Sequence, residues 1–132
     1  MCRVFIADDV KAIRRLWTLY LEEDPAVQVV GEAADGNEVL AGVAATRPDV
    51  LVLDLSMPER DGLEVIPFVR ECSPETAIVV ASSFSRARIG PLAEELGAVA
   101  YYEKGGTPDE FRELVRGARA ALATAGVTNR LR

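Results

Sequence analysis

Residues 50–58 read Val-Leu-Val-Leu-Asp-Leu-Ser-Met-Pro, and the change from apolar to charged side chains at Asp54 decides the fold. Val50–Leu53 is an unbroken apolar run, which is typical of a strand buried on both faces of a parallel sheet. Asp54 is the first polar residue after that run. Parallel strands end at one edge of their sheet, and ligands bind outside those ends. We therefore expect Asp54 to lie at the ligand-binding edge of a parallel sheet.

Four more short apolar runs resemble this one, and helical patterns separate all of them. The further runs are Val4–Ala7, Val27–Ala33, Ala77–Ala81 and Val99–Tyr102. Asp35 with Glu38 is a capping pattern at the start of one helix, and Thr107–Glu110 is a stronger one. Strands that alternate with helices are joined by right-handed crossovers. The sequence therefore predicts an α/β fold with a doubly wound, five-stranded parallel sheet.

The remaining helical patterns predict packing and one interruption. Trp17 and Phe111 belong to apolar stripes at helical spacing, and we assign both to the core. Gly90-Pro91 interrupts the fourth helical pattern, so we expect its ordered part to be mainly Pro91–Leu96.

The length of 132 residues suits one domain. We expect that domain to span residues 1–123. Residues 124–132 carry no clear apolar stripe, and we expect a C-terminal tail or the start of a linker there.

Composition excludes several classes of function. The chain has 15 Lys and Arg against 21 Asp and Glu, a net charge of −6, which argues against nucleic-acid binding by this domain. It has no histidine, and Cys2 and Cys72 form no CxxC motif, so zinc sites and His-activated nucleophiles lack their residues. Free thiols suit a reducing cytoplasm. Met1–Ile6 is unlike a signal peptide and no apolar run approaches a membrane span, so we expect a cytoplasmic protein.

Polar residues at the other strand ends predict a metal site around Asp54. Asp8 and Asp9 follow the first apolar run. Two carboxylates about 4 Å apart repel by roughly 4 kcal/mol at an effective dielectric constant of about 20, so such a cluster must take up protons or bind a cation. A few hard oxygen ligands suit Mg²⁺.

Two further strand-end residues predict phosphoryl chemistry. Lys104, after the fifth run, would supply a positive charge for a phosphoryl oxygen, and Ser82, after the fourth, would supply a hydroxyl donor. An Asp carboxylate can attack phosphorus, and a metal with a lysine neutralises the charge that develops. The sequence therefore predicts Mg²⁺-dependent phosphoryl transfer to Asp54.

In this order, these residues resemble the response-regulator receiver domains of two-component signalling. The resemblance covers about Arg3 to Leu122 and rests on Asp8-Asp9, Asp54-Leu55-Ser56-Met57-Pro58 with Asp61-Gly62, Ser82, and Tyr101-Tyr102-Glu103-Lys104. It implies a flavodoxin-like (βα)5 fold with strand order 2-1-3-4-5. The residue after Lys104 is Gly105, where many members have a proline with a cis bond. In this the chain resembles the subgroup whose receivers often precede a helix-turn-helix output domain.

The resemblance also implies a role for each site residue. Asp54 matches the phosphoacceptor, Asp9 the direct Mg²⁺ ligand and Asp8 the acid that acts through water. The backbone carbonyl of Ser56 matches the third protein ligand of the metal. Lys104 matches the lysine that pairs with the phosphoryl group.

Two residues match the switch of the family. Ser82 matches the hydroxyl that moves to meet the phosphoryl group, and Tyr101 the aromatic whose rotation reports the state of the site. Ser83 is an alternative switch hydroxyl, but the spacing to Lys104 favours Ser82.

The resemblance further implies partners and a limited catalytic activity. The phosphoryl donor would be a sensor histidine kinase or a phosphotransfer protein, and the protein would catalyse its own phosphorylation and dephosphorylation without being a conventional enzyme. Other implied partners are an output protein that the sequence does not identify and a second copy of the chain. We expect no membrane association.

Two other functions fit parts of the pattern. One is a receiver-like binding module that is never phosphorylated, although such a module would be expected to have lost Asp54 or one of the paired acids. The other is a phosphatase that forms an aspartyl phosphate, but the chain has no insertion long enough for a substrate cap. The complete acid set favours the phosphoacceptor switch.

Overall fold

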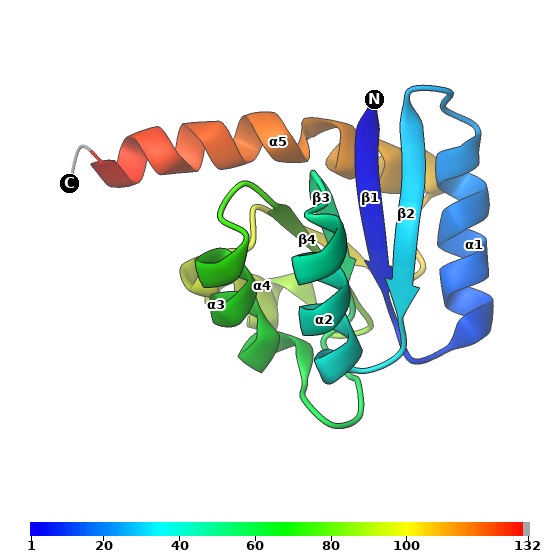
Figure 1. The fold of residues 1–132 in the computed structure, drawn as a ribbon, viewed down its shortest axis with the longest axis horizontal. Coiled ribbons are helices and arrows are strands. Elements are labelled where there is room, and N and C mark those ends of the chain that lie inside the picture. The colour runs from blue at the N-terminus through cyan, green and yellow to red at the C-terminus, as the bar shows by residue number, and fades with distance from the viewer. Residues whose placement is uncertain (131–132) are drawn as a thin grey trace.

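The structure is a computed structural model that describes the backbone of residues 1–130 and the side chains of residues 1–125. Five strands and five helices alternate along the chain (Figure 1). The strands are β1 (Cys2–Ala7), β2 (Val27–Ala33), β3 (Val50–Leu53), β4 (Ala77–Ser82) and β5 (Ala100–Glu103). The helices are α1 (Lys11–Glu22), α2 (Gly36–Thr46), α3 (Gly62–Cys72), α4 (Arg86–Leu96) and α5 (Pro108–Arg130).

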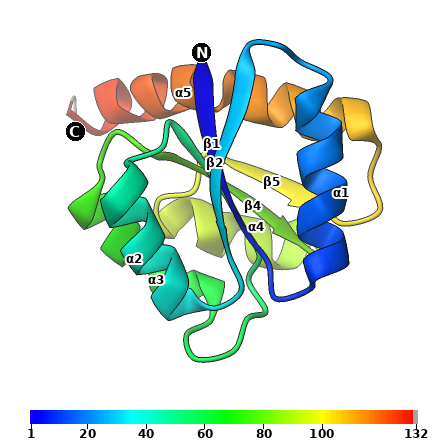
Figure 2. The same ribbon diagram turned by 45° about the vertical axis from the view of Figure 1, so that its right-hand side comes forward.

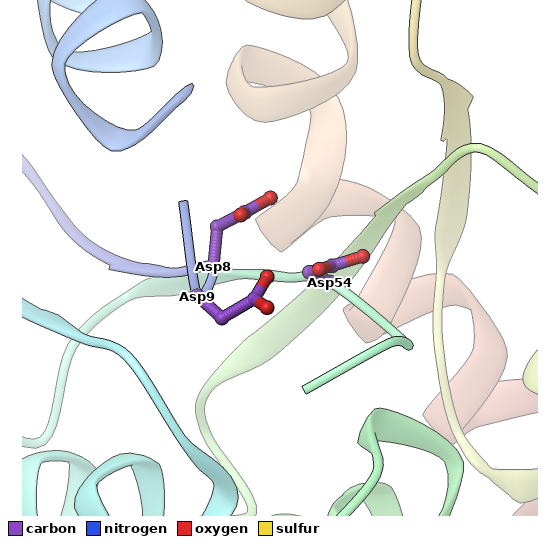
Figure 3. A group of neighbouring side chains, drawn as sticks. All are labelled: Asp8, Asp9 and Asp54. Atoms are coloured by element: carbon purple, nitrogen blue, oxygen red, sulfur yellow. The ribbon is translucent and has the colours of Figure 1, made fainter. Parts of the chain in front are cut away.

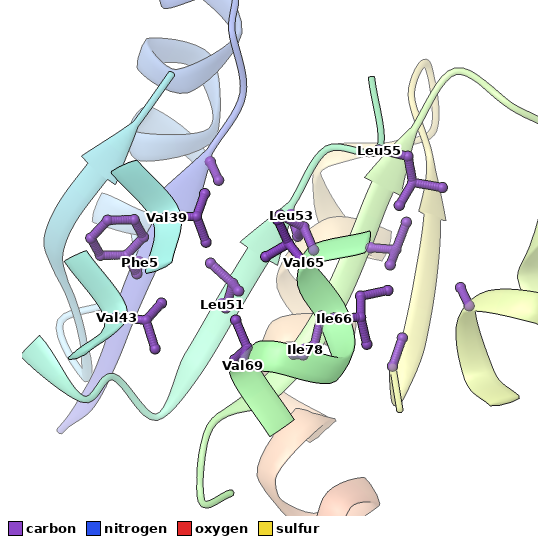
Figure 4. Close-up of a cluster of buried hydrophobic side chains, with 14 of the residues drawn as sticks. Phe5, Val39, Val43, Leu51, Leu53, Leu55, Val65, Ile66, Val69 and Ile78 are labelled. Carbon is purple, nitrogen blue, oxygen red and sulfur yellow. The ribbon is translucent and has the colours of Figure 1, made fainter. Parts of the chain in front are cut away.

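The strands form one parallel sheet in the order β2-β1-β3-β4-β5. This confirms the predicted doubly wound α/β fold and its strand order. Helices α1 and α5 cover one face, and α2, α3 and α4 cover the other (Figure 2). The three central strands are therefore apolar on both faces, and every residue of β3 is buried. Figure 4 shows part of the second face, where Leu51 and Leu53 pack against Val65 and Val69 of α3.

The register of the sheet aligns the carboxyl ends of its central strands. Ala7 pairs with Leu53 across β1 and β3, and Leu53 pairs with Val80 across β3 and β4. The ladder continues one residue beyond β3, because the Asp54 N–H donates to the Ala7 carbonyl at 2.9 Å. The residues that follow β1 and β3 therefore meet at one edge.

Two capping predictions are confirmed. The Asp35 carboxylate accepts a hydrogen bond from the Glu38 N–H at 2.8 Å, and Glu38 accepts one from the Ala34 N–H at 2.7 Å. Thr107 Oγ1 accepts from the Glu110 N–H at 3.1 Å. These bonds satisfy N–H groups that have no partner within the helix.

The prediction for the fourth helix is wrong, because α4 begins at Arg86 rather than near Pro91. The Arg86 N–H, in the first turn, donates to Glu103 Oε1 on β5 at 2.6 Å, a contact between distant residues that the local sequence does not reveal. Pro91 removes the N–H that would bond to the carbonyl of Ala87. Ala87 is exposed, so water can reach the carbonyl that is left free.

The last helix continues through most of the segment predicted as a tail, since α5 extends to Arg130. Residues 131–132 lie outside the described part of the chain. Within the described residues, no helix combines the length and the apolar character needed to cross a lipid bilayer.

Candidate functional site

Three carboxylates meet at the carboxyl edge of the sheet, as the sequence predicts. One oxygen each from Asp8, Asp9 and Asp54 lies within 4.8 Å of the others. Figure 3 shows Asp8 and Asp9 extending from the end of β1 and Asp54 from the end of β3. Asp8 and Asp54 are 0% and 2% exposed, whereas Asp9 is exposed to solvent. The cluster is therefore buried at Asp8 and Asp54 and open to solvent at Asp9.

The segment Asp61-Gly62 allows α3 to begin close to the end of β3. Asp61 caps the helix by accepting a hydrogen bond from the Glu64 N–H at 2.9 Å. The Gly62 N–H donates to the Leu55 carbonyl at 2.9 Å. A Cβ atom on Gly62 would lie 2.7 Å from Leu55 Cα and would also collide with the Asp54 carbonyl oxygen. Glycine at this position therefore allows α3 to lie directly against the backbone that carries Asp54.

Lys104 reaches the cluster from the end of β5. Its Nζ lies 2.7 Å from Asp8 Oδ2 and 3.3 Å from Asp54 Oδ1. The Lys104 N–H donates to the Ser82 carbonyl at 2.8 Å, which continues the β4–β5 ladder. The Lys104–Gly105 peptide is trans, and Gly105 has a φ of 101°, a conformation that glycine adopts without strain.

The charges of the site shift the pKa values of two of its groups. Burial and the neighbouring Asp8 carboxylate raise the pKa of Asp54, while Lys104 partly opposes the shift. Burial alone would lower the pKa of Lys104, but its close contact with the Asp8 carboxylate and the negative charges of Asp54 and Asp8 outweigh burial and raise that pKa. Lys104 is therefore held as a cation beside the carboxylates.

The residues present fit a small divalent cation. Among the described side chains, Asp8 Oδ2 is a buried oxygen that accepts no hydrogen bond of regular geometry, although Lys104 lies at ion-pair distance from it. The other oxygen of that carboxylate accepts from the Val10 N–H at 2.8 Å, which fixes its direction. Three converging carboxylates, one of them with an oxygen that accepts no regular hydrogen bond, form the hard oxygen set that Mg²⁺ prefers.

Ser56 lies next to this set on the β3–α3 loop. Its N–H donates to Asp54 Oδ1 at 3.3 Å, so its backbone is held at the rim of the cluster. Its role as a carbonyl ligand stays a prediction.

Ser82 and Tyr101 both hold the loop between β4 and α4. Ser82 is buried at the end of β4, and its Oγ accepts from the Phe84 N–H at 3.1 Å. The buried Tyr101 donates its phenol O–H to the Phe84 carbonyl at 2.8 Å, and burial raises the pKa of that phenol. Ser83 is exposed, which favours Ser82 as the hydroxyl that faces the site. Both predicted switch residues thus form a hydrogen bond with the backbone of Phe84.

Two residues on α1 contact the site without having been predicted there. Arg14 donates to the Asp8 carbonyl at 2.6 Å and pairs with Glu32 of β2 at 2.6 Å, so it ties the β1–α1 loop to the neighbouring strand. Trp17, which the sequence assigns to the core, presents its ring to Lys104. An arginine and an apolar residue on a helix give no local sign of such contacts, so the sequence carried no usable signal.

The chain is thus a doubly wound α/β protein with an acidic cluster and a lysine at the carboxyl edge of its sheet. The family model described as "response regulator receiver domain" matches residues 4–116. The chain belongs to that family. Its members generally bind Mg²⁺ through an acidic pocket, and such a cluster is present here in Asp8, Asp9 and Asp54.

Relatives carry the same domain within longer proteins. The chain is 36% identical over 125 residues to the uncharacterized transcriptional regulatory protein YhcZ of Bacillus subtilis, covering 93% of this chain and 58% of that protein. It is 42% identical over 102 residues to a protein-glutamate methylesterase/protein-glutamine glutaminase of Geobacter sulfurreducens, covering 77% of this chain and 27% of that protein. The chain thus spans little more than half of one of these relatives and about a quarter of the other.

A solved structure agrees with the fold. The signal receiver domain of the putative response regulator NarL from Mycobacterium tuberculosis superposes with a TM-score of 0.85 at 32% sequence identity. The match covers 90% of this chain and 96% of that one.

Proposed function

We propose that this chain is a phosphoacceptor switch in which Asp54 receives a phosphoryl group from a phosphohistidine. The observation that carries the proposal is the position of the Asp54 carboxylate. It is 2% exposed, lies 3.3 Å from Lys104 Nζ and shares a cluster with Asp8 and Asp9. A carboxylate in that setting is a nucleophile flanked by the charges that phosphoryl transfer requires.

In the transfer step an Asp54 carboxylate oxygen attacks phosphorus and forms an acyl phosphate. The phosphorus–nitrogen bond of the donor breaks, and the imidazole nitrogen keeps its electron pair. Lys104 pairs with a phosphoryl oxygen as negative charge accumulates. Water later attacks the acyl phosphate, which restores the carboxylate and releases inorganic phosphate and a proton.

We assign Asp9 and Asp54 as direct ligands of Mg²⁺, Asp8 as a ligand through water and the Ser56 carbonyl as the third protein ligand. Bound Mg²⁺ supplies charge neutralisation and orients the phosphoryl oxygens. The mutual proximity of the three carboxylates supports this assignment, as does Asp8 Oδ2, which has no regular hydrogen bond and only Lys104 at ion-pair distance.

Phosphorylation would act on the loop that Ser82 and Tyr101 hold. A Ser82 hydroxyl that donates to the phosphoryl group changes its bond with the Phe84 N–H. Tyr101 bonds to the carbonyl of the same residue, so its phenol responds to the movement of that loop. A ligand shifts such an equilibrium only by its different affinity for the two states. The surface of the β4–α4 loop would then be the part of the molecule to which a partner binds differently after phosphorylation.

Membership of the receiver family supports a proposal for the wider setting. We propose a sensor histidine kinase or a phosphotransfer protein as the donor, in the cytoplasm. The output partner would be another domain of the same protein or a separate protein. A second copy of the chain is a further partner to test. The receiver domain spans residues 1–123 in this proposal.

The test is phosphorylation of the purified chain by phosphoramidate with Mg²⁺, followed by intact mass. We expect one added phosphoryl group in the wild type and none in Asp54→Asn, and no addition when EDTA removes Mg²⁺. A Ser82→Ala variant should still gain the mass but lose the accompanying change in hydrogen exchange at the β4–α4 loop. An unmodified wild-type protein, or modification that persists in Asp54→Asn, would contradict the proposal and favour a binding module.

A further inference from the structure

The side chain of Lys104 lies between the acidic cluster and the ring of Trp17. Its Nζ is 5.7 Å from the centroid of the indole ring, within the distance of about 6 Å at which a ring face attracts a cation. The same nitrogen is 2.7 Å from Asp8 Oδ2. Trp17 is buried on α1, so water does not screen its side of the contact. The ammonium therefore has an aromatic partner in addition to the Asp8 and Asp54 carboxylates.

The Trp17 ring belongs to an aromatic cluster to which α1, α5 and β5 contribute. It stacks on Phe111 of α5 with centroids 5.6 Å apart and an interplanar angle of 20°. Phe111 meets Tyr102 of β5 edge-on at 5.2 Å and Tyr20 of α1 at 6.0 Å. Stacking on the buried Phe111 restricts rotation of the buried Trp17 ring, which keeps one ring face toward Lys104.

We propose that Trp17 is a positioning residue for Lys104, and that its ring keeps the ammonium at the acidic edge, where a phosphoryl group on Asp54 would meet it. The inference rests on the proposed function. A lysine side chain has four rotatable carbon–carbon bonds, and the side chain of Lys104 is 21% exposed, so the ammonium can turn toward solvent unless a partner besides the carboxylates holds it. The ring removes part of that freedom before the phosphoryl group arrives.

This role differs from ordinary core packing in what it requires of the residue. Packing alone requires an apolar side chain of suitable volume, which leucine partly supplies. Attraction of a cation requires an aromatic face, and tryptophan provides the strongest one. Phenylalanine keeps a weaker version of the same face. The series Trp, Phe, Leu at position 17 therefore separates the two roles.

The first experiment measures the rate of phosphorylation by phosphoramidate at saturating Mg²⁺ and donor. We expect Trp17→Leu to slow the reaction about fivefold or more, within the range of about two- to thirtyfold that cation–π contacts represent from exposed to desolvated sites. Trp17→Phe should restore most of the rate. Tyr20→Leu is the matched control, because Tyr20 touches Phe111 in the same aromatic cluster, and it should stay within about twofold of the wild type.

The second experiment uses the intact cluster, so it does not depend on whether Trp17→Leu folds. Trp17 is the single tryptophan of the chain, and its fluorescence reports its own surroundings. We expect Lys104→Met to change the emission of the ligand-free protein, because a charge leaves the ring face. We also expect beryllium fluoride with Mg²⁺, a mimic of the phosphoryl group, to change wild-type emission as Lys104 moves, and to have no effect in Lys104→Met.

The two proposals fail separately. A wild-type protein that gains no mass refutes the phosphoacceptor function, while the ligand-free emission of Lys104→Met still tests the contact. A Trp17→Leu variant as fast as the wild type, or a Tyr20→Leu variant as slow as Trp17→Leu, would overturn the positioning role. Identical emission from the wild type and Lys104→Met would overturn it as well.

Discussion

Replacing Lys104 by methionine is predicted to destabilise the metal-free protein by about 3 kcal/mol. The Nζ atom lies 2.7 Å from Asp8 Oδ2 and 3.3 Å from Asp54 Oδ1. At an effective dielectric constant of about 20 these distances correspond to gross attractions of about 6 and 5 kcal/mol. Desolvation offsets most of that sum, and breaking a buried pair typically costs about 3–5 kcal/mol. Because the Lys104 side chain is 21% exposed, water screens the pair and the lower end applies.

The assay is urea and thermal unfolding at pH 7 in EDTA. For a domain of 132 residues a loss of that size corresponds to roughly a 10 °C fall in the melting temperature. Lys11→Met is the matched control, since Lys11 is exposed on α1 and is the other lysine of the chain. It should stay within about 0.5 kcal/mol of the wild type.

The same substitution should strengthen Mg²⁺ binding. The ammonium repels a divalent cation that approaches the carboxylates, so its removal should raise the Mg²⁺ affinity roughly tenfold in calorimetric titrations. The double variant Lys104→Met/Asp54→Asn should recover part of the lost stability, because one of the two unpaired carboxylates is gone. A Lys104→Met protein that is as stable as the wild type in EDTA, or that binds Mg²⁺ more weakly, would refute this account of the site.

Two further predictions concern the residues at the end of β3. Asp54→Asn should raise the free energy of unfolding at pH 7, because burial and Asp8 raise the pKa of Asp54 in the folded protein, and that group stabilises the fold only while it is protonated. The stability that protonated Asp54 contributes is complete below its unfolded pKa of 3.8 and is lost as the pH rises through its higher pKa in the folded protein. Urea titrations should therefore show the difference in unfolding free energy between Asp54→Asn and the wild type shrinking as the pH falls. Gly62→Ala should cost about 1–3 kcal/mol and slow phosphorylation, because its Cβ would meet the backbone of Leu55 and Asp54. Gly117→Ala in α5, where nothing lies within 4 Å, should instead be neutral or stabilising by up to about 1 kcal/mol; equal effects of the two alanines on unfolding would contradict the packing argument.

The sequence predicted most of the fold because its signals are local. Unbroken apolar runs such as Val50–Leu53 are typical of strands that are covered on both faces, and every residue of this one is buried. The confirmed helix caps at Asp35 and Thr107 are hydrogen bonds between residues three positions apart. The acidic cluster was also predictable, because parallel strands place the residues that follow them at one edge. Asp8, Asp9 and Asp54 meet there for that reason.

What only the tertiary structure decided are the contacts between residues far apart in the chain. Glu103 of β5 accepts a hydrogen bond from the first turn of α4, and α4 begins at Arg86. Reasoning from the local effect of Pro91 does not predict this start. The ring of Trp17 meets Lys104 because packing on Phe111 turns it toward the site. Periodicity shows that a residue is buried, whereas its partner depends on how the helices pack on the sheet. By itself the sequence determined the chemistry at the strand ends, and three-dimensional packing determined which side chains hold that chemistry in place.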